Sequence, residues 1–598
     1  MRVSEYIANR LSELGVHHVF MVTGGGSMFL NYAISKHPNI TPVFNHHEQA
    51  SAMAAEGYAR ITNKPSVVNV TTGPGGINAL NGVYGAYTDS IPMLVLSGQV
   101  KLETYIRTYD LPNLRQLGDQ EVDIISMVYG ITKYAVTITD PQTIRYHLEK
   151  AWHLAQSGRP GPCWLDIPID VQSSQIDETK LDGFASDLNP TVASIQLVES
   201  VAQTLGKLKN AQRPVILAGT GVRLADAVDV FNRVVHKLGI PVTTGWTHDL
   251  IASDDLVFVG RPGTIGTRPG NFAVQNSDLL LVIGNRLNIR QTGYAFKSFA
   301  RAAHKIWVDV DPAELHRPTI QADMPIVSDA KIFLEEMERQ LDNWDAGQFK
   351  NWLAWCKERQ TRYPAVLPKH REFNDKINPY HFMEVLFENL AEDDVVVTGN
   401  ATACIVSFQT GKIKLGQRLF SNSGSASMGY DLPAAIGSAV ARNGKRVICL
   451  AGDGSLQMNI QELQTVTQYK LPVKIFVLNN NGYLSIRTSQ KGFFGDTVGE
   501  SPESSVSFPD IQKIAKAYEI PYKRLAVKNF SKPLRDVLEA EGPVLCEVVL
   551  DPTQGFEPRQ SSRQLPDGRI VSAPLEDMFP FLEREELMEN LLIPAWEE

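Results

Sequence analysis

The sequence has few cysteines and no long apolar run. Its five cysteines, Cys163, Cys356, Cys404, Cys449 and Cys546, are scattered, and none belongs to a CxxC pair. Because most of them lie in apolar, strand-like runs, we expect small buried side chains rather than metal ligands or disulfides. No stretch approaches the ~18 uninterrupted apolar residues of a membrane-spanning helix. We therefore expect a soluble, cytoplasmic protein that has no membrane partner.

Basic runs, low-complexity segments and short repeats are also missing. The 598 residues include 57 Lys and Arg and 66 Asp and Glu, which gives a net charge of −9. This acidic balance, without a basic run, argues against a nucleic-acid partner. Apolar residues make up 43% of the chain, an ordinary value for a globular protein. The length corresponds to about three or four domains, each able to bury a core.

Three segments are present in which strand-like and helix-like patterns alternate. In residues 1–173 the strand-like runs HVFMVTGG, PSVVNVTTGPGG and PMLVLSG each end in glycine. Residues 191–345 contain PVILAGTGVR, DLLLVIGNRL and KIWVDVDPAEL, and residues 379–552 follow the same alternation. Such alternation predicts an α/β fold with doubly wound, parallel-sheet domains.

Between and after these segments the composition changes. Residues 173–190 are polar, and residues 345–378 are charged and punctuated by proline, so we interpret both as linkers, the second partly helical. Residues 553–598 are rich in charge and proline and lack strand periodicity. This tail is either a lid or a surface arm.

The third segment carries the pattern with the clearest chemistry. The strand-like run RVICLA leads into the Gly-Asp-Gly turn at 452–454, and the strand VKIFVL leads into an Asn run. Apolar residues at helical spacing predict one helix over 456–466 between them. In such a unit both strands run the same way, so Asp453 and Asn480 emerge at one crevice. Oxygen ligands of this kind suit Mg²⁺ completed by a diphosphate; the alternative is a tight turn followed by an Asn-rich loop.

These motifs resemble those of thiamin diphosphate (ThDP) enzymes. GDGS followed by NNNG is similar to the ThDP signature, and the similarity to the acetohydroxyacid synthase group extends over nearly the whole chain. Other matching stretches are NHHEQASAMAAEGYAR, VTTGPGGINALNGVYGAYTDSIPMLVLSGQ, QEVDI, GRPGPCWLDIP and SMGYDLPAAIG. The resemblance implies a pyrimidine-binding first domain, a central domain and a diphosphate-binding third domain. It also implies a homodimer or homotetramer with the cofactor held between subunits, and small-molecule substrates.

In the first domain the resemblance singles out three side chains. Glu48 would be the carboxylate that exchanges a proton with the aminopyrimidine ring; the alternative is an acid that caps the following helix. Gln120 would donate a hydrogen bond near the reacting carbonyl. His47, beside His46, is either an acid–base group or a solvated loop histidine, and both interpretations stay open.

In the third domain the resemblance implies a metal and diphosphate site. Met428 would support the bent cofactor, and the backbone carbonyl of Ala426 would accept from its amino group. Asp453 and Asn480 would bind Mg²⁺ through their side chains, and Gly482 through its backbone oxygen. The diphosphate would meet Gly399, Asn400, Thr402, Gly452, Gly454 and Ser455.

The central domain contains glycine-rich turns similar to those that hold FAD in acetohydroxyacid synthases. These turns are GTGVR, GTIGTRPGN, GNRLNIRQTG and VDVDP, and they make Gly221, Arg223, Arg286 and Asp309 candidate FAD contacts. Many relatives keep this domain without a flavin, so FAD binding is left open.

Two positions depart from the synthases of branched-chain amino-acid precursors. Ile169, in LDIPIDVQ, stands where those enzymes have lysine, and Ser489, in YLSIRTSQ, stands where they have tryptophan. Arg290 matches the arginine that meets the acceptor carboxylate, or else it faces FAD or a phosphate. We therefore expect a 2-ketoacid, pyruvate, to be decarboxylated and the acyl-anion unit to pass to an acceptor other than a second pyruvate.

The whole pattern, including the tail, looks like that of synthase-like proteins of surface-sugar pathways, in which the acceptor is a nucleotide-activated ketosugar. Arg559 and Arg563 in the tail would then meet phosphates, or they are plain surface charge. The alternatives are an acetolactate synthase proper, a simple 2-ketoacid decarboxylase, an inactive cofactor-binding regulatory protein and a structural scaffold. The presence of Glu48, Asp453 and Asn480 argues against the inactive protein, and a structural scaffold would take up no ThDP.

Overall fold

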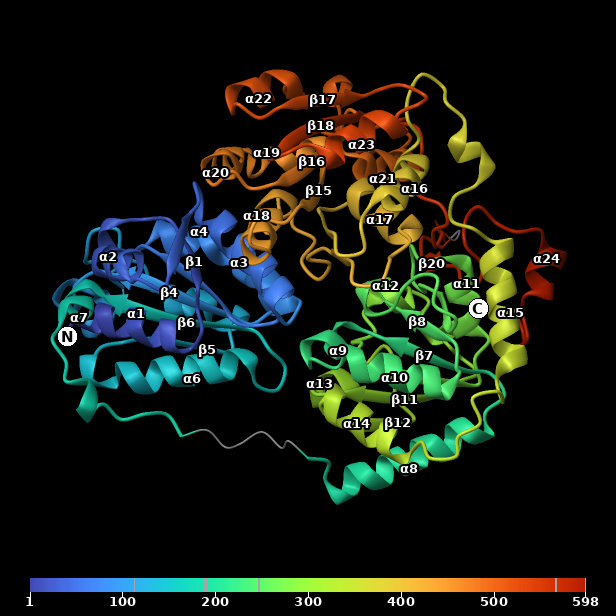
Figure 1. Ribbon diagram of the computed structural model, residues 1–598, viewed down its shortest axis with the longest axis horizontal. Helices are drawn as coiled ribbons and strands as arrows, with labels where there is room; N and C mark the ends of the chain where they lie inside the picture. Colours follow the sequence, from blue (N-terminus) through green and yellow to red (C-terminus); the bar gives the residue numbers. More distant parts are fainter. Residues whose placement is uncertain (112, 186–191, 246–247, 565–566, 597–598) are drawn as a thin grey trace.

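The computed structural model describes residues 1–111, 113–185, 192–245, 248–564 and 567–596. These residues form three sheets of six strands each and one two-stranded sheet. Every strand pair in the three large sheets is parallel. Figure 1 shows the sheets as three bodies, each with helices on its faces. The predicted α/β class with three doubly wound domains is confirmed.

The first sheet has its most buried strands towards the centre. In spatial order its strands are β2 (Thr41–Phe44), β1 (His18–Met21), β3 (Ser66–Val70), β4 (Met93–Gln99), β6 (Pro162–Pro168) and β5 (Tyr134–Thr137). Every residue of β3, β4 and β6 is buried, as expected when helices cover both faces. The helices are α1 (Val3–Glu13), α2 (Met28–Lys36), α3 (Glu48–Thr62), α4 (Pro74–Thr88), α5 (Ile124–Val128), α6 (Ile144–Gln156) and α7 (Ile169–Ser173).

The central sheet has a different order. Its strands are β12 (Met324–Val327), β11 (His304–Asp309), β10 (Leu279–Ile283), β7 (Pro214–Ala218), β8 (Val242–Thr244) and β9 (Phe258–Gly260). The strand order reverses between β7 and β10, which is where open α/β sheets bind ligands. The helices are α8 (Ile195–Asn210), α9 (Thr220–Leu224), α10 (Val228–Leu238), α11 (Arg268–Gln275), α12 (Ile289–Thr292), α13 (Pro312–Leu315) and α14 (Ala330–Gln340).

The third sheet repeats the order of the first: second, first, third, fourth, sixth and fifth strand. Its strands are β14 (Arg418–Phe420), β13 (Val395–Thr398), β15 (Val447–Gly452), β16 (Val473–Asn479), β18 (Val544–Val549) and β17 (Tyr522–Leu525). The helices are α16 (Pro379–Asn389), α17 (Thr402–Thr410), α18 (Asp431–Ala441), α19 (Asp453–Gln457), α20 (Leu463–Gln468), α21 (Leu484–Phe494), α22 (Ile511–Ala517) and α23 (Ser531–Glu539).

The single helix predicted over 456–466 is wrong. The segment divides into α19, a short 3₁₀ turn at Ile460–Glu462 and α20. The break falls at Asn459, whose side chain donates a hydrogen bond to the Gly429 carbonyl at 2.7 Å. A contact with a distant segment therefore overrides the regular apolar spacing.

The tail is a docked structure rather than a strandless arm. It forms an antiparallel hairpin of β19 (Ser562–Gln564) and β20 (Ile570–Ser572), followed by α24 (Arg584–Glu589). Glu576 is buried, accepts a hydrogen bond from Gln275 and pairs with Arg301 at 2.8 Å. The expectation of no strands there is wrong: the hairpin strands are only three residues each, too short for a periodic pattern, and the chain after them is held on the central domain by Glu576.

The predicted linkers differ from each other. Residues 345–378 contain α15 (Lys350–Arg362), which packs on the central domain: the Trp352 indole donates to the Pro214 carbonyl at 2.9 Å. Residues 173–190 contain one 3₁₀ turn, Glu178–Lys180, and their last part lies outside the described residues. All five cysteines are buried and free, as expected.

The first and third domains meet along α3 and α18, which lie side by side in Figure 1. A Cβ atom on Gly57 would lie 2.2 Å from the Ala434 carbonyl oxygen, and one on Gly437 would lie 1.8 Å from that of Ala54. The two backbones therefore touch, in antiparallel register. No larger side chain fits at either glycine without movement of a backbone.

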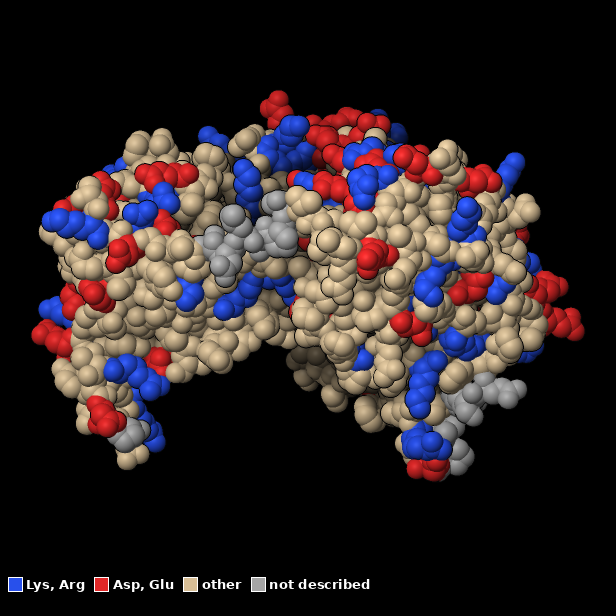
Figure 2. Space-filling view, turned by 90° about the horizontal axis from the view of Figure 1, so that it is seen from below, with Lys and Arg blue, Asp and Glu red and all other residues tan. Residues whose placement is uncertain are grey.

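The surface carries both signs of charge. On the face shown in Figure 2, basic and acidic side chains are interspersed, and the molecule is hollowed between its two lobes. Among the described residues, no helix has the length and apolar character needed to cross a membrane.

Candidate functional site

The two predicted metal ligands lie at one edge of the third sheet. Asp453 follows β15 directly, Asn480 follows β16, and these strands pair in parallel with Gly452 opposite Leu478. The Asp453 carboxylate accepts hydrogen bonds from the backbone N–H groups of Gly454 at 2.9 Å and Gly482 at 3.0 Å. The turn after one strand is therefore tied to the loop after the next.

The donor atoms of this edge fit a hard cation. Asn480 is buried; its Nδ2 donates to Thr402 Oγ1 at 3.3 Å, whereas its Oδ1 has no hydrogen-bond partner among the described residues. An unpartnered buried oxygen costs about 1–3 kcal/mol, which a bound cation would offset. Burial raises the pKa of Asp453 to about 6, and a cation would reverse this shift.

The protein supplies only part of a coordination shell here. Among the described residues, no group of three or more His, Cys, Asp or Glu side chains could hold a metal. An aspartate, an amide oxygen and a backbone carbonyl would leave positions for phosphate oxygens and water, which is the usual arrangement for Mg²⁺.

The loop after β13 lies beside this edge. Asn400 Nδ2 donates to the Ala426 carbonyl at 2.8 Å, so in this structure the oxygen predicted to face the cofactor accepts from the protein. Thr402 is buried at the start of α17 and contacts Asn480. Met428 is half-buried two residues after Ala426. The structure thus brings the predicted diphosphate and metal residues together, and their roles stay predictions.

Asp431 was missed by the sequence analysis. It is fully buried at the start of α18, and burial raises its pKa to about 6. Ser455 Oγ donates to its Oδ2 at 2.6 Å and accepts from the Gly429 backbone at 2.8 Å. Asp431 therefore links the segment that carries Met428 to the Gly-Asp-Gly turn. An acid directly after the apolar SMGY segment was the available signal.

In the first domain Glu48 is the first residue of α3 and is buried. Its Oε2 accepts a hydrogen bond from Asn78 Nδ2 at 3.0 Å. His47 caps the same helix, since its Nδ1 accepts from the Gln49 backbone at 3.1 Å. This cap explains the position of His47, and its acid–base role stays a prediction. Gln120 is exposed in a loop with φ of 62°.

Contacts between the first and third domains reach close to Glu48 but do not include it. Glu462 accepts from the Asn45 side chain and the His46 backbone, both at 2.9 Å, and Ser427 donates to Asn81 at 2.8 Å. Among the described residues of this one chain, no hydrogen bond or ion pair joins Glu48 to the metal edge.

A second site is a cavity of about 500 Å³, within the size range of ligand pockets. All three domains line it, at the point where the central sheet reverses its strand order. The four candidate FAD contacts line it together with arginines of the first and third domains: Gly221, Arg223, Arg286, Asp309, Arg60 and Arg418. The four residues that the sequence marked as candidate FAD contacts therefore line one cavity.

The charges of this cavity are partly paired. Burial alone would raise the pKa of Asp249, but the charges of Arg418 and Arg223 hold it below its ordinary value. Arg286 donates to the Thr88 carbonyl at 3.0 Å, which ties the central domain to the first. Burial raises the pKa of Asp309 to about 6.

Among the described residues, no hydrogen bond or ion pair joins the positions predicted to meet an acceptor to one another. Ile169 is half-buried at the start of α7, and Ser489 is exposed on α21. Arg290 is exposed on α12. Burial raises the pKa of Cys404 on α17 to about 12, and the charge of Arg290 is among the smaller influences that lower it. The Arg559 guanidinium lies 4.9 Å from the centre of the Phe579 ring, and the side chain of Arg563 lies outside the described part of the chain.

Comparison with known proteins gives matches along most of the chain. Three family models match: "Thiamine pyrophosphate enzyme, N-terminal TPP binding domain" at residues 1–127, the corresponding "central domain" at 201–337 and "C-terminal TPP binding domain" at 399–548. The chain is 32% identical over 556 residues to a probable acetolactate synthase large subunit of Methanococcus aeolicus, covering 89% of each chain.

Plant and algal relatives are similar to the same degree. Acetolactate synthase 1, chloroplastic, of Zea mays is 32% identical over 562 residues, covering 92% of this chain and 85% of its own. The acetolactate synthase large subunit of Porphyra purpurea is 32% identical over 555 residues, covering 90% of each chain. The similarity therefore includes the metal edge, the Glu48 helix and the central cavity in one continuous match.

Proposed function

Because the chain belongs to the thiamine pyrophosphate enzyme family, as an acetolactate synthase-like carboligase, we propose that it decarboxylates a 2-ketoacid with ThDP and Mg²⁺. Pyruvate is the first candidate donor, and the acyl-anion unit passes to a carbonyl acceptor. The observation that carries the metal part is the buried, unpartnered Oδ1 of Asn480 beside the Asp453 carboxylate.

The residues would divide the work between two domains. When bound, ThDP supplies the nucleophilic carbon and takes up the electrons released by decarboxylation. Asp453, Asn480 and the Gly482 carbonyl would hold Mg²⁺ and thereby its diphosphate. Glu48, whose Oε2 is held by Asn78, would exchange a proton with the pyrimidine ring through Oε1.

We propose a homodimer or homotetramer with shared active sites. Glu48 belongs to the first domain and the metal edge to the third, and among the described residues no hydrogen bond or ion pair joins Glu48 to that edge. An active site completed by the first domain of a partner subunit is consistent with this separation.

We also propose that the central cavity takes FAD. Its volume of about 500 Å³, its place at the strand-order reversal and its arginines suit a dinucleotide with a diphosphate. Gly221, Arg223, Arg286 and Asp309 would then be contacts of the flavin nucleotide. The visible absorbance of the purified protein, and of the flavin extracted from it, tests this part of the proposal.

The acceptor has two candidates. The names of the relatives favour a second pyruvate, which gives acetolactate. Ile169 and Ser489 favour a different and larger acceptor, a nucleotide-activated ketosugar, because a positive charge and a bulky ring of the synthases are both replaced. Under the second candidate the donor residues Glu48, Asp453 and Asn480 are retained, and these two changes alter the acceptor side.

One experiment decides between them. The protein is incubated with ThDP, Mg²⁺ and pyruvate, with and without a nucleotide ketosugar, and carbon dioxide and acetolactate are measured. We expect carbon dioxide release that requires both cofactors and increases with the sugar. Efficient acetolactate formation with the sugar untouched would identify an acetolactate synthase. Asp453→Asn should abolish release, and the exposed Asp177→Asn is the matched control; release that survives Asp453→Asn would overturn the metal assignment.

A further inference from the structure

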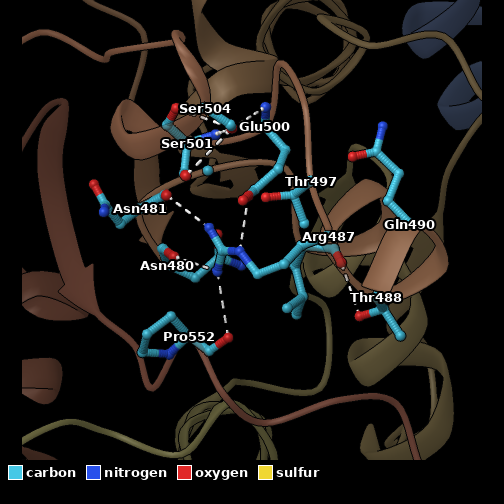
Figure 3. A network of polar contacts seen from close by, with 12 residues as sticks. Asn480, Asn481, Arg487, Thr488, Gln490, Thr497, Glu500, Ser501, Ser504 and Pro552 are labelled. Carbon is cyan, nitrogen blue, oxygen red and sulfur yellow. Dashed lines mark hydrogen bonds and ion pairs between the residues drawn. The ribbon is translucent and has the colours of Figure 1, made fainter. Parts of the chain in front are cut away.

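Arg487 lies on the first turn of α21, and its side chain points back under the loop that carries Asn480 (Figure 3). Its Nε donates to Glu500 Oε2 at 2.7 Å. The side chains of Arg487 and Glu500 are only 12% and 3% exposed. A buried ion pair is by itself weak evidence for stability, so its other contacts decide what it does.

The remaining donors of Arg487 end on backbone carbonyls. Nη2 donates to the Asn481 carbonyl at 2.8 Å, and Nη1 donates to the Asn480 carbonyl at 3.3 Å. Nη1 also reaches the carbonyl of Pro552 at 3.3 Å. One planar guanidinium thus holds two consecutive carbonyls of the metal loop, which a lysine ammonium could not do in the same geometry.

The loop held in this way has an unusual backbone. Asn481 has φ of 58° and Gly482 has φ of 140°, both in the region that most side chains avoid. A Cβ on Gly482 would lie 2.1 Å from the Glu500 carbonyl oxygen and 2.7 Å from Arg487 Nη2. A strained conformation of this kind persists only when its surroundings fix it.

Glu500 fixes the loop from the other side. Its carbonyl accepts from the Tyr483 backbone at 2.8 Å, while its carboxylate orients Arg487. Its own backbone N–H donates to Ser504 Oγ at 2.9 Å, and the Val498 N–H donates to Gln490 Oε1 on α21 at 2.7 Å. Residues 498–504 therefore form a small turn that clamps the metal loop against α21.

We propose that Arg487 and Glu500 are positioning residues for the metal loop. By fixing the carbonyls of Asn480 and Asn481, they leave the Asn480 side chain and the Gly482 carbonyl free to bind the cation. The inference rests on the proposed function for the identity of the cation. It adds a reciprocal consequence: metal binding tightens residues 498–504 and the chain at Pro552.

The test compares three variants. Arg487→Met removes all four contacts, and Glu500→Gln removes only the charge of the partner. Arg371→Met is the matched control, because Arg371, in the segment that leads into the third domain, makes a two-bond pair with Glu384 of α16, at 2.9 and 2.7 Å, without touching the loop. ThDP binding to the full-length protein is measured by calorimetry at increasing Mg²⁺ concentration.

We expect the Mg²⁺ concentration for half-maximal ThDP binding to rise about 10- to 100-fold in Arg487→Met, the range typical of residues that support metal ligands. Glu500→Gln should give a smaller increase, and Arg371→Met none. Turnover of Arg487→Met should recover at saturating Mg²⁺. An unchanged Mg²⁺ requirement in Arg487→Met would overturn the proposal.

Hydrogen exchange without ThDP or metal separates this inference from the proposed function. The amide of Gly482, which donates to Asp453, should exchange faster in Arg487→Met, while those of β15 and β16 keep their protection. Arg487→Lys, which keeps the charge, serves if Arg487→Met does not fold. Loss of protection throughout the domain would show a stabilising role only. If the wild type fails to bind ThDP, the proposed function fails, and exchange still decides the role of Arg487.

Discussion

The first and third domains share one strand order, but their central turns leave different amounts of space. In the first domain the turns after β1 and β3 fill each other: a Cβ on Gly26 would lie 1.8 Å from Thr72 Oγ1. In the third domain the atom nearest to a Cβ on Gly452 would be 3.9 Å away. At these two glycines the same topology therefore gives a filled turn in the first domain and an open one, next to Asp453, in the third. Other turns of the third domain are tight, since a Cβ on Gly399 would lie 2.3 Å from Asp431 Oδ2.

The two sheets also differ in the acid carried by the strand that is fifth in spatial order, β6 in the first domain and β18 in the third. On β6, Asp166 is buried and accepts only from neutral groups of Ser97, Gln99 and Thr137. On β18, Glu547 accepts from Asn479 at 2.7 Å, directly before the metal loop. Asp166 is therefore hydrogen-bonded within the core of the first domain, whereas Glu547 contacts the residue that precedes the metal loop.

The largest expected effect would break this comparison, because it gives a chemical role to the first domain, whose turn at Gly26 is filled. In Glu48→Gln, turnover should fall by about 10²- to 10⁴-fold, since the glutamine cannot accept the proton. ThDP affinity should stay unchanged, because the metal edge is intact. Carbon dioxide release and calorimetry measure the two quantities, with the exposed Glu103→Gln as control. Full activity in Glu48→Gln would remove Glu48 from the mechanism.

The next effect sharpens the comparison by adding one methyl group to each of the two turns, at Gly26 and at Gly452. Gly26→Ala should destabilise the protein by about 1–3 kcal/mol, because the methyl group enters space that Thr72 fills. Gly452→Ala should change stability by less than about 0.5 kcal/mol, since its φ of −72° suits alanine and no atom is close. Thermal denaturation midpoints of both variants give the difference. Equal shifts of the denaturation midpoint in both variants would mean that the turns at Gly26 and Gly452 do not differ in packing.

The last prediction concerns the pH dependence of the first domain, whose effect is spread over several pH units. Burial raises the pKa of Asp166 to about 7 from an ordinary 3.8. The folded protein therefore holds a proton that the unfolded chain releases, and this stability is fully present below about pH 4 and lost as pH rises towards about 7. The loss is at most about 1.4 kcal/mol per pH unit.

Asp166→Asn should flatten that slope. The denaturation midpoint is measured for the wild type, for Asp166→Asn and for the exposed Asp177→Asn from acidic to neutral pH. We expect only Asp166→Asn to change the slope. An identical slope in the wild type and Asp166→Asn would show that Asp166 is ionised throughout.

The sequence predicted what depends on neighbouring strands. Asp453 and Asn480 could be placed at one edge because parallel strands that follow each other through one helix end on the same side. The central-domain group Gly221, Arg223, Arg286 and Asp309 was found through its glycine-rich turns and lines one cavity.

What the sequence did not show depends on contacts between distant residues. The shared strand order of the first and third domains leaves no repeat in the sequence, because a sheet requires buried apolar strands and not particular residues. Arg487 lies among ordinary polar residues, and only the folded loop brings its guanidinium to the carbonyls of Asn480 and Asn481. Asp431 was missed because a buried acid after an apolar run has no periodic signal.

The backbone contact between α3 and α18 has a mechanical consequence. Since Gly57 and Gly437 leave no side chain between the helices at these two points, a sliding motion of α3 along α18 would press backbone against backbone. Small shear motions between the first and third domains are therefore resisted there. A motion that admits a substrate would then involve the central domain and the C-terminal tail rather than sliding of the first domain on the third.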